Sequence, residues 1–389
     1  MSQTDESAIV TLVDRILARA VADGASDVHL EPRTDRVRVR FRIDGLLVDR
    51  PPFPPNLGPP VTSRLKVMAR LDISEKRLPQ DGAFRIQLPD GDVDTRLSTF
   101  PTDFGEKVVL RILSRGEVSL ELEGLGMETP MADALRLHAN RAHGMCLVTG
   151  PTGSGKTSTL YALLNAIDGN RRNIQTLEDP IEYRFEHVIQ GQVNEKVGFT
   201  FARGLRSMLR QDPDVIMVGE MRDGETANIA FKAALTGHLV LSSLHTNSAI
   251  ETFVRLFDMG LERYVVASAL SAMVGQRLVR RLCLACKRPQ LTDEGVTALL
   301  VECGVPLFGQ HHVAPGCPAC NATGYRGRSG IYEVIEVDDA LSDLVKNERT
   351  TRAELRAYMN QRHLHGLRAA GFAKVAQGET SVDEVLRVT

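Results

Sequence analysis

The stretch GMCLVTGPTGSGKT, residues 144–157, joins an apolar run to a loop rich in glycine. Residues 145–148 have the composition of a buried strand, and apolar residues recur from Leu160 to Ile167 behind the loop. The spacing G-x-x-x-x-G-K-[ST] is typical of a phosphate-binding loop, whose glycines let successive backbone N–H groups converge on a polyphosphate. The helix start behind it adds free donors and a positive dipole end. The stretch therefore predicts a site for a nucleoside triphosphate.

The side chains of this loop have separate expected roles. Lys156 reaches the β- and γ-phosphates as a mobile charge, and the Thr157 hydroxyl takes one position on Mg²⁺. The residues expected to hold the nucleotide are Gly150, Pro151, Thr152, Gly153, Ser154, Gly155, Lys156 and Thr157. A chance glycine-rich turn is the alternative, but the strand before the loop and the helix after it supply the context that the motif requires.

Length and composition indicate a soluble globular protein of two domains with an appendage. The 389 residues are too many for one core, and a net charge of −2 gives no overall electrostatic signature of nucleic-acid binding. The first residues, MSQTDES, are polar and acidic where a signal peptide would be basic and then apolar. No stretch approaches the roughly 20 apolar residues of a membrane span. We expect a cytosolic protein whose cysteines are thiols or metal ligands.

Residues 1–113 predict a small α+β domain, and 114–126 a linker. The expected elements are a helix over 6–22, strands over 37–43 and 46–48, a helix over 61–71, and strands over 83–88, 93–99 and 107–113. Residues 51–60 carry six prolines and are expected to form a loop, because proline suits neither a helix interior nor a central strand.

Charged residues share one face of two strands in this domain. Four arginines alternate with apolar residues, at Arg36, Arg38, Arg40 and Arg42. Their face is either a solvated surface or a contact with a subunit or a phosphate. Three further polar residues alternate at Asp27, His29 and Glu31. They could be metal ligands, but polar residues along a half-buried strand need no metal.

Apolar runs alternate with helical stretches over residues 127–280. Strands are expected over 173–177, 214–218 and 239–242, with helices over 201–210 and 226–235. This alternation predicts an α/β domain whose parallel sheet is covered on both faces. Ligands of such sheets bind at the carboxyl ends of the strands, so the residues that follow each strand are the candidates for chemistry.

Polar residues of a suitable kind follow each of these strands. Glu178 and Asp179 follow the first, Glu220 and Arg222 the second, and His245 the third. Carboxylates at these places can hold Mg²⁺ and polarise the attacking water in phosphoryl transfer. Capping of helix N-termini by acidic side chains is the alternative interpretation.

Two C-x-x-C pairs follow the last of these motifs, at Cys283, Cys286, Cys317 and Cys320. Four thiolates in two such pairs suit a tetrahedral structural Zn²⁺, and redox-active or simply reduced thiols are the alternative. We expect a zinc-binding insertion over 281–328, too poor in periodic apolar residues to order itself without metal. Residues 329–389 then form a mostly helical subdomain that begins with a strand over 330–337.

Four ordered blocks resemble the motifs of a known superfamily. GPTGSGKTSTLY, TLEDPIEY, LRQDPDVIMVGEMRD and TGHLVLSSLHTN look like the Walker A, Asp box, Walker B and His box of the secretion ATPases. The chain is most similar to type II secretion ATPases and type IV pilus assembly ATPases, from ASDVHLEP to the C-terminal cysteines. The resemblance implies a RecA-like P-loop ATPase core behind a PAS-like N-terminal domain, with ATP, Mg²⁺ and Zn²⁺ as cofactors.

The resemblance also implies a setting. It implies a cytoplasmic homohexamer, peripheral at the inner membrane, in which ATP hydrolysis turns the N-terminal lobes against the RecA-like lobes. That motion works an inner-membrane platform protein in type II protein secretion or, as the alternative, in type IV pilus assembly. Most members carry a further N-terminal domain that docks on a membrane adaptor. This sequence begins at the helix before ASDVHLEP, which leaves the adaptor contact open.

Carried over to this sequence, the resemblance assigns catalytic roles. Glu220 is the Walker B glutamate that organises Mg²⁺ and water, while Glu178 and Asp179 belong to the Asp box. His238 and His245 are the His-box pair that senses the γ-phosphate. The phosphate-contacting and interface arginines match Arg96, Arg111, Arg206 and Arg210. For the first two of these, an ion pair on a strand face is the alternative.

A nucleic-acid motor is the alternative function from another class, because RecA-like cores also drive helicases. The near-neutral charge and the lack of interleaved basic and aromatic residues disfavour it, so we expect no nucleic-acid partner. A scaffold that binds nucleotide without turnover is disfavoured by the presence of Lys156 and Glu220.

Overall fold

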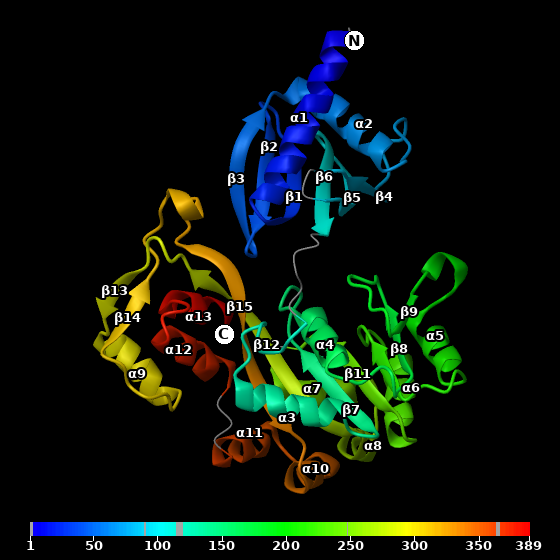
Figure 1. The fold of residues 1–389 in the computed structure, drawn as a ribbon, viewed down its shortest axis with the longest axis vertical. Coiled ribbons are helices and arrows are strands. Elements are labelled where there is room, and N and C mark those ends of the chain that lie inside the picture. Colours follow the sequence, from blue (N-terminus) through cyan, green and yellow to red (C-terminus); the bar gives the residue numbers. More distant parts are fainter. Residues whose placement is uncertain (1–2, 89–90, 114–119, 247, 363–365) are drawn as a thin grey trace. The chain divides into compact units, whose positions relative to one another are not determined.

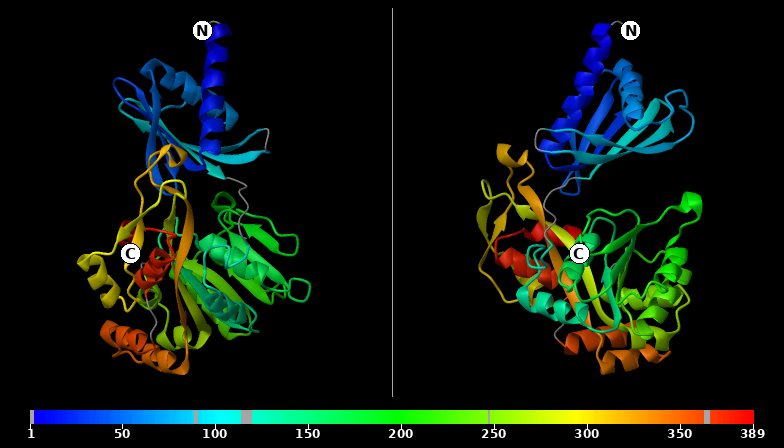
Figure 2. Two further views of the ribbon diagram at one scale, coloured as in Figure 1. Left: turned by 60° about the vertical axis from the view of Figure 1, so that its left-hand side comes forward. Right: turned by 45° about the vertical axis from the view of Figure 1, so that its right-hand side comes forward.

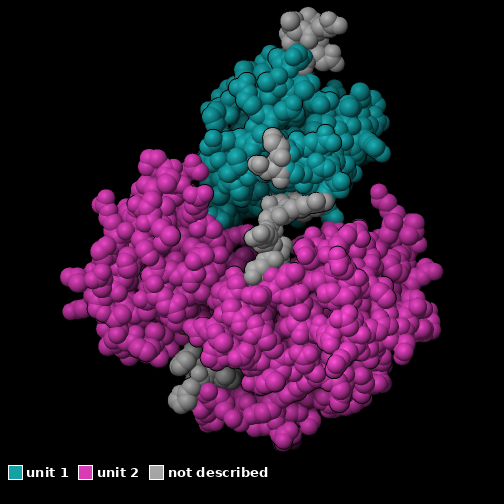
Figure 3. Space-filling model, in the orientation of Figure 1, with its two compact units in different colours: residues 1–118 teal, residues 119–389 magenta. Residues whose placement is uncertain are grey.

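The computed structural model describes residues 3–88, 91–113, 120–246, 248–362 and 366–389. These residues form two compact units, residues 1–118 and 119–389 (Figures 1 and 3). Within the predicted linker, residues 114–119 lie outside the described residues. Leu122, from the same predicted linker, is buried in the core of the second unit. None of the helices described is long and apolar enough to cross a membrane.

The first unit is an antiparallel sheet with two helices packed on one of its faces. Its elements are α1 (Gln3–Ala22), β1 (Ala25–Pro32), β2 (Val37–Ile43), β3 (Leu46–Phe53), α2 (Gly58–Met68), β4 (Gln80–Ile86), β5 (Val93–Thr102) and β6 (Gly105–Leu113). The strand order is β3-β2-β1-β6-β5-β4. Alternate strand residues such as Phe41 and Leu110 pack with Leu17 of α1 and Leu65 of α2. The opposite face carries the charged side chains.

The expectation of a loop over 51–60 is wrong at both ends. Pro51 and Pro52 belong to β3, and α2 already begins at Gly58. Both exceptions have the same cause: proline lacks a backbone N–H, and at these positions the sheet or helix needs no hydrogen bond from that group. β3 is an edge strand of its sheet, and Pro59 lies in the first turn of α2, where backbone N–H groups have no helical partner.

The second unit is built on a seven-stranded sheet in the order β15-β12-β7-β11-β10-β8-β9. The strands are β7 (Gly144–Thr149), β8 (Ile174–Glu178), β9 (Ile189–Gln192), β10 (Val215–Val218), β11 (Leu239–Leu244), β12 (Leu270–Leu282) and β15 (Tyr325–Glu336). All neighbours are parallel except β12 and β15, which pair antiparallel. The predicted parallel sheet is therefore present, with one antiparallel strand at its edge.

Helices cover both faces of this sheet (Figures 1 and 2). They are α3 (Thr129–Ala139), α4 (Lys156–Asn165), α5 (Phe201–Met208), α6 (Gly224–Leu235), α7 (Ala249–Asp258) and α8 (Arg263–Ala269). Leu135 of α3 and Leu163 of α4 are buried with Val148 on one face. On the other face Phe231 of α6 and Phe253 of α7 are buried with Leu147. Successive residues of β7 thus serve two cores, as expected of a strand buried on both faces.

The C-terminal third adds two further strands and helices to the second unit. The remaining elements are β13 (Arg288–Leu291), α9 (Glu294–Glu302), β14 (Gln310–Val313), α10 (Asp339–Lys346), α11 (Arg352–Gln361), α12 (Leu367–Ala376) and α13 (Val382–Val388). The strand expected over 330–337 is the longer β15, an edge of the central sheet. The segment between the cysteine pairs was expected to be too poor in apolar residues to order itself without metal. It does contribute to a small core, because Leu300 of α9 packs with Phe372 and Val385.

Candidate functional site

The phosphate-binding loop connects β7 to α4, and several of its glycines have positive φ, a backbone conformation that other residues rarely adopt. Gly150 has φ of 155° and Gly155 has φ of 87°. A Cβ on Gly150 would lie 2.5 Å from the backbone oxygen of Gln276 on the neighbouring β12. The loop is therefore pressed against the sheet. The N–H groups of Gly150 and Ser154 donate to the Leu244 and Pro151 carbonyl oxygens, both at 3.3 Å, whereas the first N–H groups of α4 have no acceptor within the helix.

Lys156, the first residue of α4, lies over the loop with its amine turned back towards it. Its Nζ donates to the carbonyl oxygens of Gly150, at 2.9 Å, and Pro151, at 3.1 Å. Burial lowers the pKa of the Lys156 amine to about 8, although the nearby Glu220 carboxylate opposes this shift. A buried cation of this kind favours an anionic neighbour such as a phosphate.

The loop also holds a buried polar atom that no described residue satisfies. Ser154 is 3% exposed, and its Oγ has no hydrogen-bond partner among the described residues. The N-terminus of α4 likewise has no side-chain cap. A buried hydroxyl and free helix N–H groups are groups that phosphate oxygens could satisfy. The loop therefore fits the polyphosphate of a nucleotide.

Three further residues of the predicted site gather at the carboxyl ends of the neighbouring strands. His245, after β11, lies with Nδ1 3.5 Å from Nζ of Lys156 and with Nε2 3.2 Å from Oε2 of Glu220, after β10. The Nε of Arg222 donates to Oε1 of Glu220 at 2.6 Å, and its Nη2 lies 3.1 Å from Oδ2 of Asp179, after β8. We call Lys156, His245, Glu220, Arg222 and Asp179 the strand-end cluster. Parallel pairing of β8, β10, β11 and β7 brings these residues to one edge.

Arg222 is the member of this cluster to which the sequence gave no role. Its bond to Glu220 raises the pKa of the guanidinium, so it stays charged and holds two carboxylates together. Its guanidinium also lies 5.7 Å from the ring centre of Phe201 on α5. The only sequence signal was its place two residues after Glu220.

The Glu178 carboxylate points away from the cluster. Glu178 is 2% exposed and accepts hydrogen bonds from the hydroxyl of Tyr161, from Oγ1 of Thr176 at 2.5 Å and from Nε2 of Gln190 at 3.0 Å. Adjacent residues at the end of a strand point to opposite sides. The structure accordingly places Asp179 in the cluster and Glu178 in the interior.

The two histidines of the predicted pair lie at opposite ends of one strand. His238 precedes β11 and His245 follows it, so about 23 Å of extended chain separates them at roughly 3.3 Å per residue. The Nδ1 of His238 lies 3.1 Å from the carbonyl oxygen of Ala233 at the end of α6. The structure therefore brings His245, and not His238, to the phosphate-binding loop of the same chain.

Arg206 on α5 and Arg210, two residues after the end of this helix, also lie outside the strand-end cluster. The Nη2 of Arg206 lies 2.5 Å from Oε1 of Glu225, and Arg210 donates through Nη1 to the backbone oxygen of Arg206 at 2.8 Å. Arg206 is more than half exposed. Both arginines are thus placed on the surface of the second unit.

In the first unit Arg96 and Arg111 face each other across β5 and β6. They line a hollow of about 570 Å³ on the charged face of the sheet, together with Asp27 and Asp81. The Nε of Arg111 lies 3.0 Å from Oδ1 of Asp27, which is the local ion pair that the alternative interpretation expected. Arg111 is nevertheless two-thirds exposed, which leaves its guanidinium open to another anion.

The other charged residues of that face are paired within the unit. The ion pairs are Arg38 with Asp49 at 2.7 Å, Arg40 with Glu31 at 2.6 Å, Lys107 with Glu31 at 3.4 Å and Arg42 with Asp27 at 3.7 Å. These contacts occupy the carboxylates of Asp27 and Glu31 with cations. They account for the acidic residues of β1 without a metal ion.

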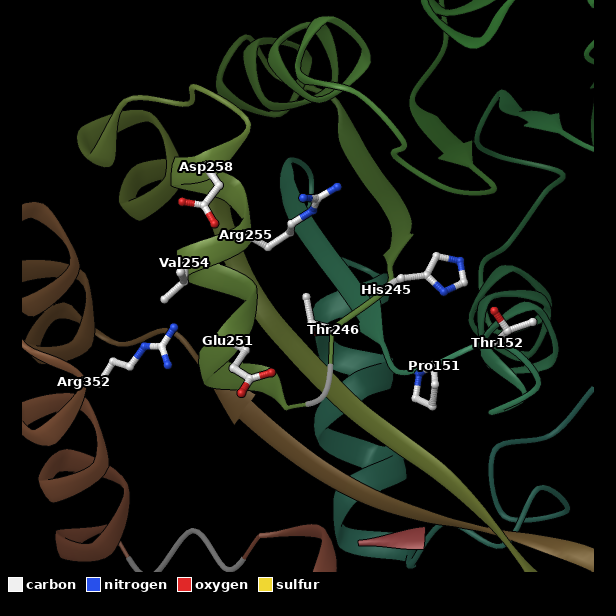
Figure 4. Close-up of a pocket in the computed structure, with 9 residues that line it drawn as sticks. All are labelled: Pro151, Thr152, His245, Thr246, Glu251, Val254, Arg255, Asp258 and Arg352. Carbon is white, nitrogen blue, oxygen red and sulfur yellow. The ribbon is translucent and has the colours of Figure 1, made fainter.

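A cavity of about 440 Å³ adjoins the phosphate-binding loop (Figure 4). Its walls are Pro151, Thr152, His245, Thr246, Glu251, Val254, Arg255, Asp258 and Arg352. Arg352 comes from the start of α11, whereas Glu251, Val254, Arg255 and Asp258 belong to α7. The cavity is thus bounded by the loop, the residues after β11, helix α7 and the start of α11. Asn247, also in the predicted His box, lies outside the described residues.

The four cysteines of the two C-x-x-C pairs converge in the structure. Their sulfur atoms lie within 4.8 Å of one another. The sulfur–sulfur distance is 3.9 Å for Cys283 with Cys317 and for Cys286 with Cys320, and 3.7 Å for Cys317 with Cys320. A tetrahedron with Zn–S bonds of about 2.3 Å has edges of about 3.8 Å. Among the described residues this is the one group of three or more potential metal ligands that lie this close together.

Backbone donors support thiolate character at this centre. The N–H groups of Cys317 and Gly324 both point to Sγ of Cys320 at 3.2 Å. Burial alone would raise the pKa of the Cys320 thiol, but these bonds, together with those of the Cys317 and Cys286 side chains, lower it to about 6, while burial and the same cluster raise the pKa of Cys286 to about 12. The sulfur distances and the donors fit a closed four-thiolate zinc site.

Comparison with known proteins gives a consistent result. The chain matches the model of a family described as type II/IV secretion system protein over residues 2–387. It is 49% identical to the type II secretion system protein E of Pseudomonas aeruginosa, over 100% of this chain and 77% of that protein. It is 47% identical to the type IV pilus assembly ATPase PilB of Myxococcus xanthus, over 98% of this chain and 68% of that protein.

Solved structures agree with these relatives. The pilus retraction motor PilT with bound ADP is 26% identical, with a TM-score of 0.62, over 97% of this chain and 96% of that chain. The ATPase DotB of Legionella pneumophila shares the fold with a TM-score of 0.70 at 19% identity, over 97% of this chain and 95% of that chain.

Proposed function

The chain belongs to the family of type II/IV secretion system proteins, and from this premise we propose that it is the ATPase that powers type II protein secretion. The observation that carries the proposal is the strand-end cluster beside a phosphate-binding loop. The imidazole of His245 there lies 3.5 Å from the Lys156 amine and 3.2 Å from the Glu220 carboxylate. These are the groups that phosphoryl transfer to water requires.

We propose the following division of labour among the residues. Lys156 and the loop amides bind the phosphates of ATP, and Thr157 with Asp179 orients Mg²⁺, which when bound neutralises charge on the β- and γ-phosphates. Glu220 orients and polarises the attacking water. His245 lies between Lys156 and Glu220, so its ring is placed to sense whether a γ-phosphate is present.

The arginines complete the site in the proposed assembly. The four arginines are surface residues of one chain: Arg206 on α5, Arg210 just after it, and Arg96 and Arg111 on the first unit. We propose a homohexamer in which such arginines contact phosphate across lobes or subunits, because a fixed guanidinium stabilises charge on the transferring phosphoryl group. Turnover would then depend on assembly.

The proposed setting is the cytoplasmic face of the inner membrane, where the ring would work a platform protein. We also propose a division into domains. It comprises an N-terminal domain over residues 1–113, a RecA-like core over 127–280, a zinc-binding insertion over 281–328 and a C-terminal part. The zinc ion is proposed as structural. Pilus assembly is the second candidate, favoured by 47% identity to PilB over 98% of this chain.

A deletion strain separates the two candidates. Loss of the gene should leave exported enzymes in the periplasm while surface pili persist if the chain serves type II secretion. Loss of pili with normal export would favour pilus assembly instead. Stimulation of purified ATPase activity by single-stranded DNA would point to the nucleic-acid motor and contradict both.

A further inference from the structure

We propose that Tyr161 is a positioning residue that holds the Asp179 turn against the helix of the phosphate-binding loop. The inference rests on the proposed role of Asp179. Tyr161 lies on α4, five residues after Lys156, and is 1% exposed. The proposed function gives Tyr161 no role in binding the nucleotide, so any effect of Tyr161 on turnover must act through other residues.

One hydroxyl joins three parts of the chain. The Tyr161 hydroxyl donates to Oε2 of Glu178 at the end of β8. The same oxygen accepts the backbone N–H of Glu182 at 3.1 Å and of Tyr183 at 3.4 Å. The helix, the strand end and the turn that follows are therefore tied at a single buried atom.

Gln190 of β9 secures the other side of the turn. Its Nε2 donates to Oε1 of Glu178 at 3.0 Å and to the carbonyl oxygen of Tyr183 at 2.9 Å, and its Oε1 accepts the N–H of Phe185 at 3.0 Å. The ring of Phe185 packs edge-on against Tyr161, with ring centres 5.4 Å apart. Both ends of the segment from Glu178 to Phe185 are thus fixed.

This network explains why a carboxylate is buried at Glu178. Burial of an ionised carboxylate is costly unless its oxygens are hydrogen-bonded, and here three donors satisfy them. Asp179 follows directly and reaches Arg222 at 3.1 Å. A shift of the Glu178 anchor would therefore move Asp179 away from Arg222 and Glu220. Glu178 acts in this account as the anchor and Asp179 as the residue that faces the site.

The first test removes only the hydroxyl, with Tyr161→Phe in the full-length protein. We expect kcat for ATP to fall about tenfold, the scale of one lost charge-assisted hydrogen bond, while KM for ATP changes less than about twofold. Tyr332→Phe is the matched control. Tyr332 lies in the same core, and its hydroxyl donates to the Leu125 carbonyl oxygen at 3.2 Å and also interacts with the Thr159 side chain on α4, so it contacts this helix without touching Glu178 or the Asp179 turn. Its variant should lose comparable thermal stability and keep wild-type kcat.

A double-mutant cycle with Asp179→Asn tests whether Tyr161 acts through Asp179. In the double variant the loss in kcat should be little larger than for Asp179→Asn alone, because the positioned group is already gone. Multiplicative losses would overturn the proposal, as would wild-type kcat in Tyr161→Phe when Asp179→Asn is impaired. Wild-type kcat in Asp179→Asn would instead refute the proposed role of Asp179. If Tyr161→Phe does not fold, Gln190→Met tests the same network, and additivity of that variant with Asp179→Asn would overturn the proposal.

Discussion

The Nε2 of His245 lies 3.2 Å from Oε2 of Glu220, and Nδ1 of the same ring lies 3.5 Å from Nζ of Lys156. One imidazole therefore touches both the residue proposed to orient water and the residue proposed to bind phosphate. Both ring nitrogens are engaged, so a change at the γ-phosphate position that moves Lys156 is transmitted to Glu220 through a single side chain.

The position of the two histidines predicts unequal effects of their removal. His245→Ala should lower kcat for ATP about 10- to 100-fold, because the link between Lys156 and Glu220 is lost. His238→Ala should have a much smaller effect on kcat, since its ring contacts Ala233 at the other end of β11. Steady-state ATPase assays compare them. Equal losses in kcat would contradict the assignment.

The contacts of Arg222 predict that its replacement lowers kcat and that lysine at this position does not restore it. Arg222→Gln should lower kcat about tenfold, because Asp179 and Glu220 lose their shared cation and repel each other. Arg222→Lys should recover little, since an ammonium group cannot make the two directed bonds. Arg203→Gln on α5 is the matched control, because that guanidinium lies 3.4 Å from the Gly198 carbonyl oxygen instead. Wild-type kcat in Arg222→Gln would refute a role in the cluster.

The lowered pKa of Lys156 predicts proton uptake on nucleotide binding. With a pKa of about 8, roughly three quarters of the Lys156 amines are neutral at pH 8.5. Bound phosphate favours the charged amine and raises its pKa, so binding at pH 8.5 takes up most of one proton. The uptake falls as the pH drops through 8, and at pH 7 it is about a tenth of a proton.

Titration calorimetry with ATPγS at pH 8.5, in two buffers of different ionisation enthalpy, measures this uptake. Lys156→Arg is the control, because its guanidinium is already protonated at every pH used. Uptake of equal size in the control, or none in the wild type, would show that Lys156 is not the group that titrates.

The cysteine geometry predicts about one Zn²⁺ per chain. Cys317→Ser with Cys320→Ser should abolish zinc binding and unfold the small core around Leu300 and Phe372 at lower temperature, while ATP affinity stays within about threefold. Metal analysis and thermal unfolding check this. A preparation made without chelators that holds no zinc and titrates as six free thiols would contradict it.

Much of the site could be predicted because its signals are local. The glycine spacing from Gly150 to Thr157 identifies the loop. Three apolar runs pair as parallel strands, which brings the residues that follow them, Asp179, Glu220 and His245, to one edge of the sheet, so this part of the cluster follows from the sequence.

Side-chain direction and long-range pairing could not be obtained in this way. Glu178 and Asp179 are neighbours in one motif, yet the alternation of a strand sends their carboxylates to opposite sides. His238 and His245 share a motif that spans a whole strand. β12 was not predicted because LSAMVGQRLVRRL mixes polar and apolar residues, and its partner β15 begins more than 40 residues later.

The proposal as a whole depends on hydrolysis at this loop, and Glu220→Gln tests that directly. ATP binding and turnover would be measured on the same preparations of wild type and variant at concentrations that support assembly. We predict ATP affinity within about threefold of wild type and kcat at least about 100-fold lower, because the amide cannot polarise water. Wild-type turnover in Glu220→Gln would contradict the account.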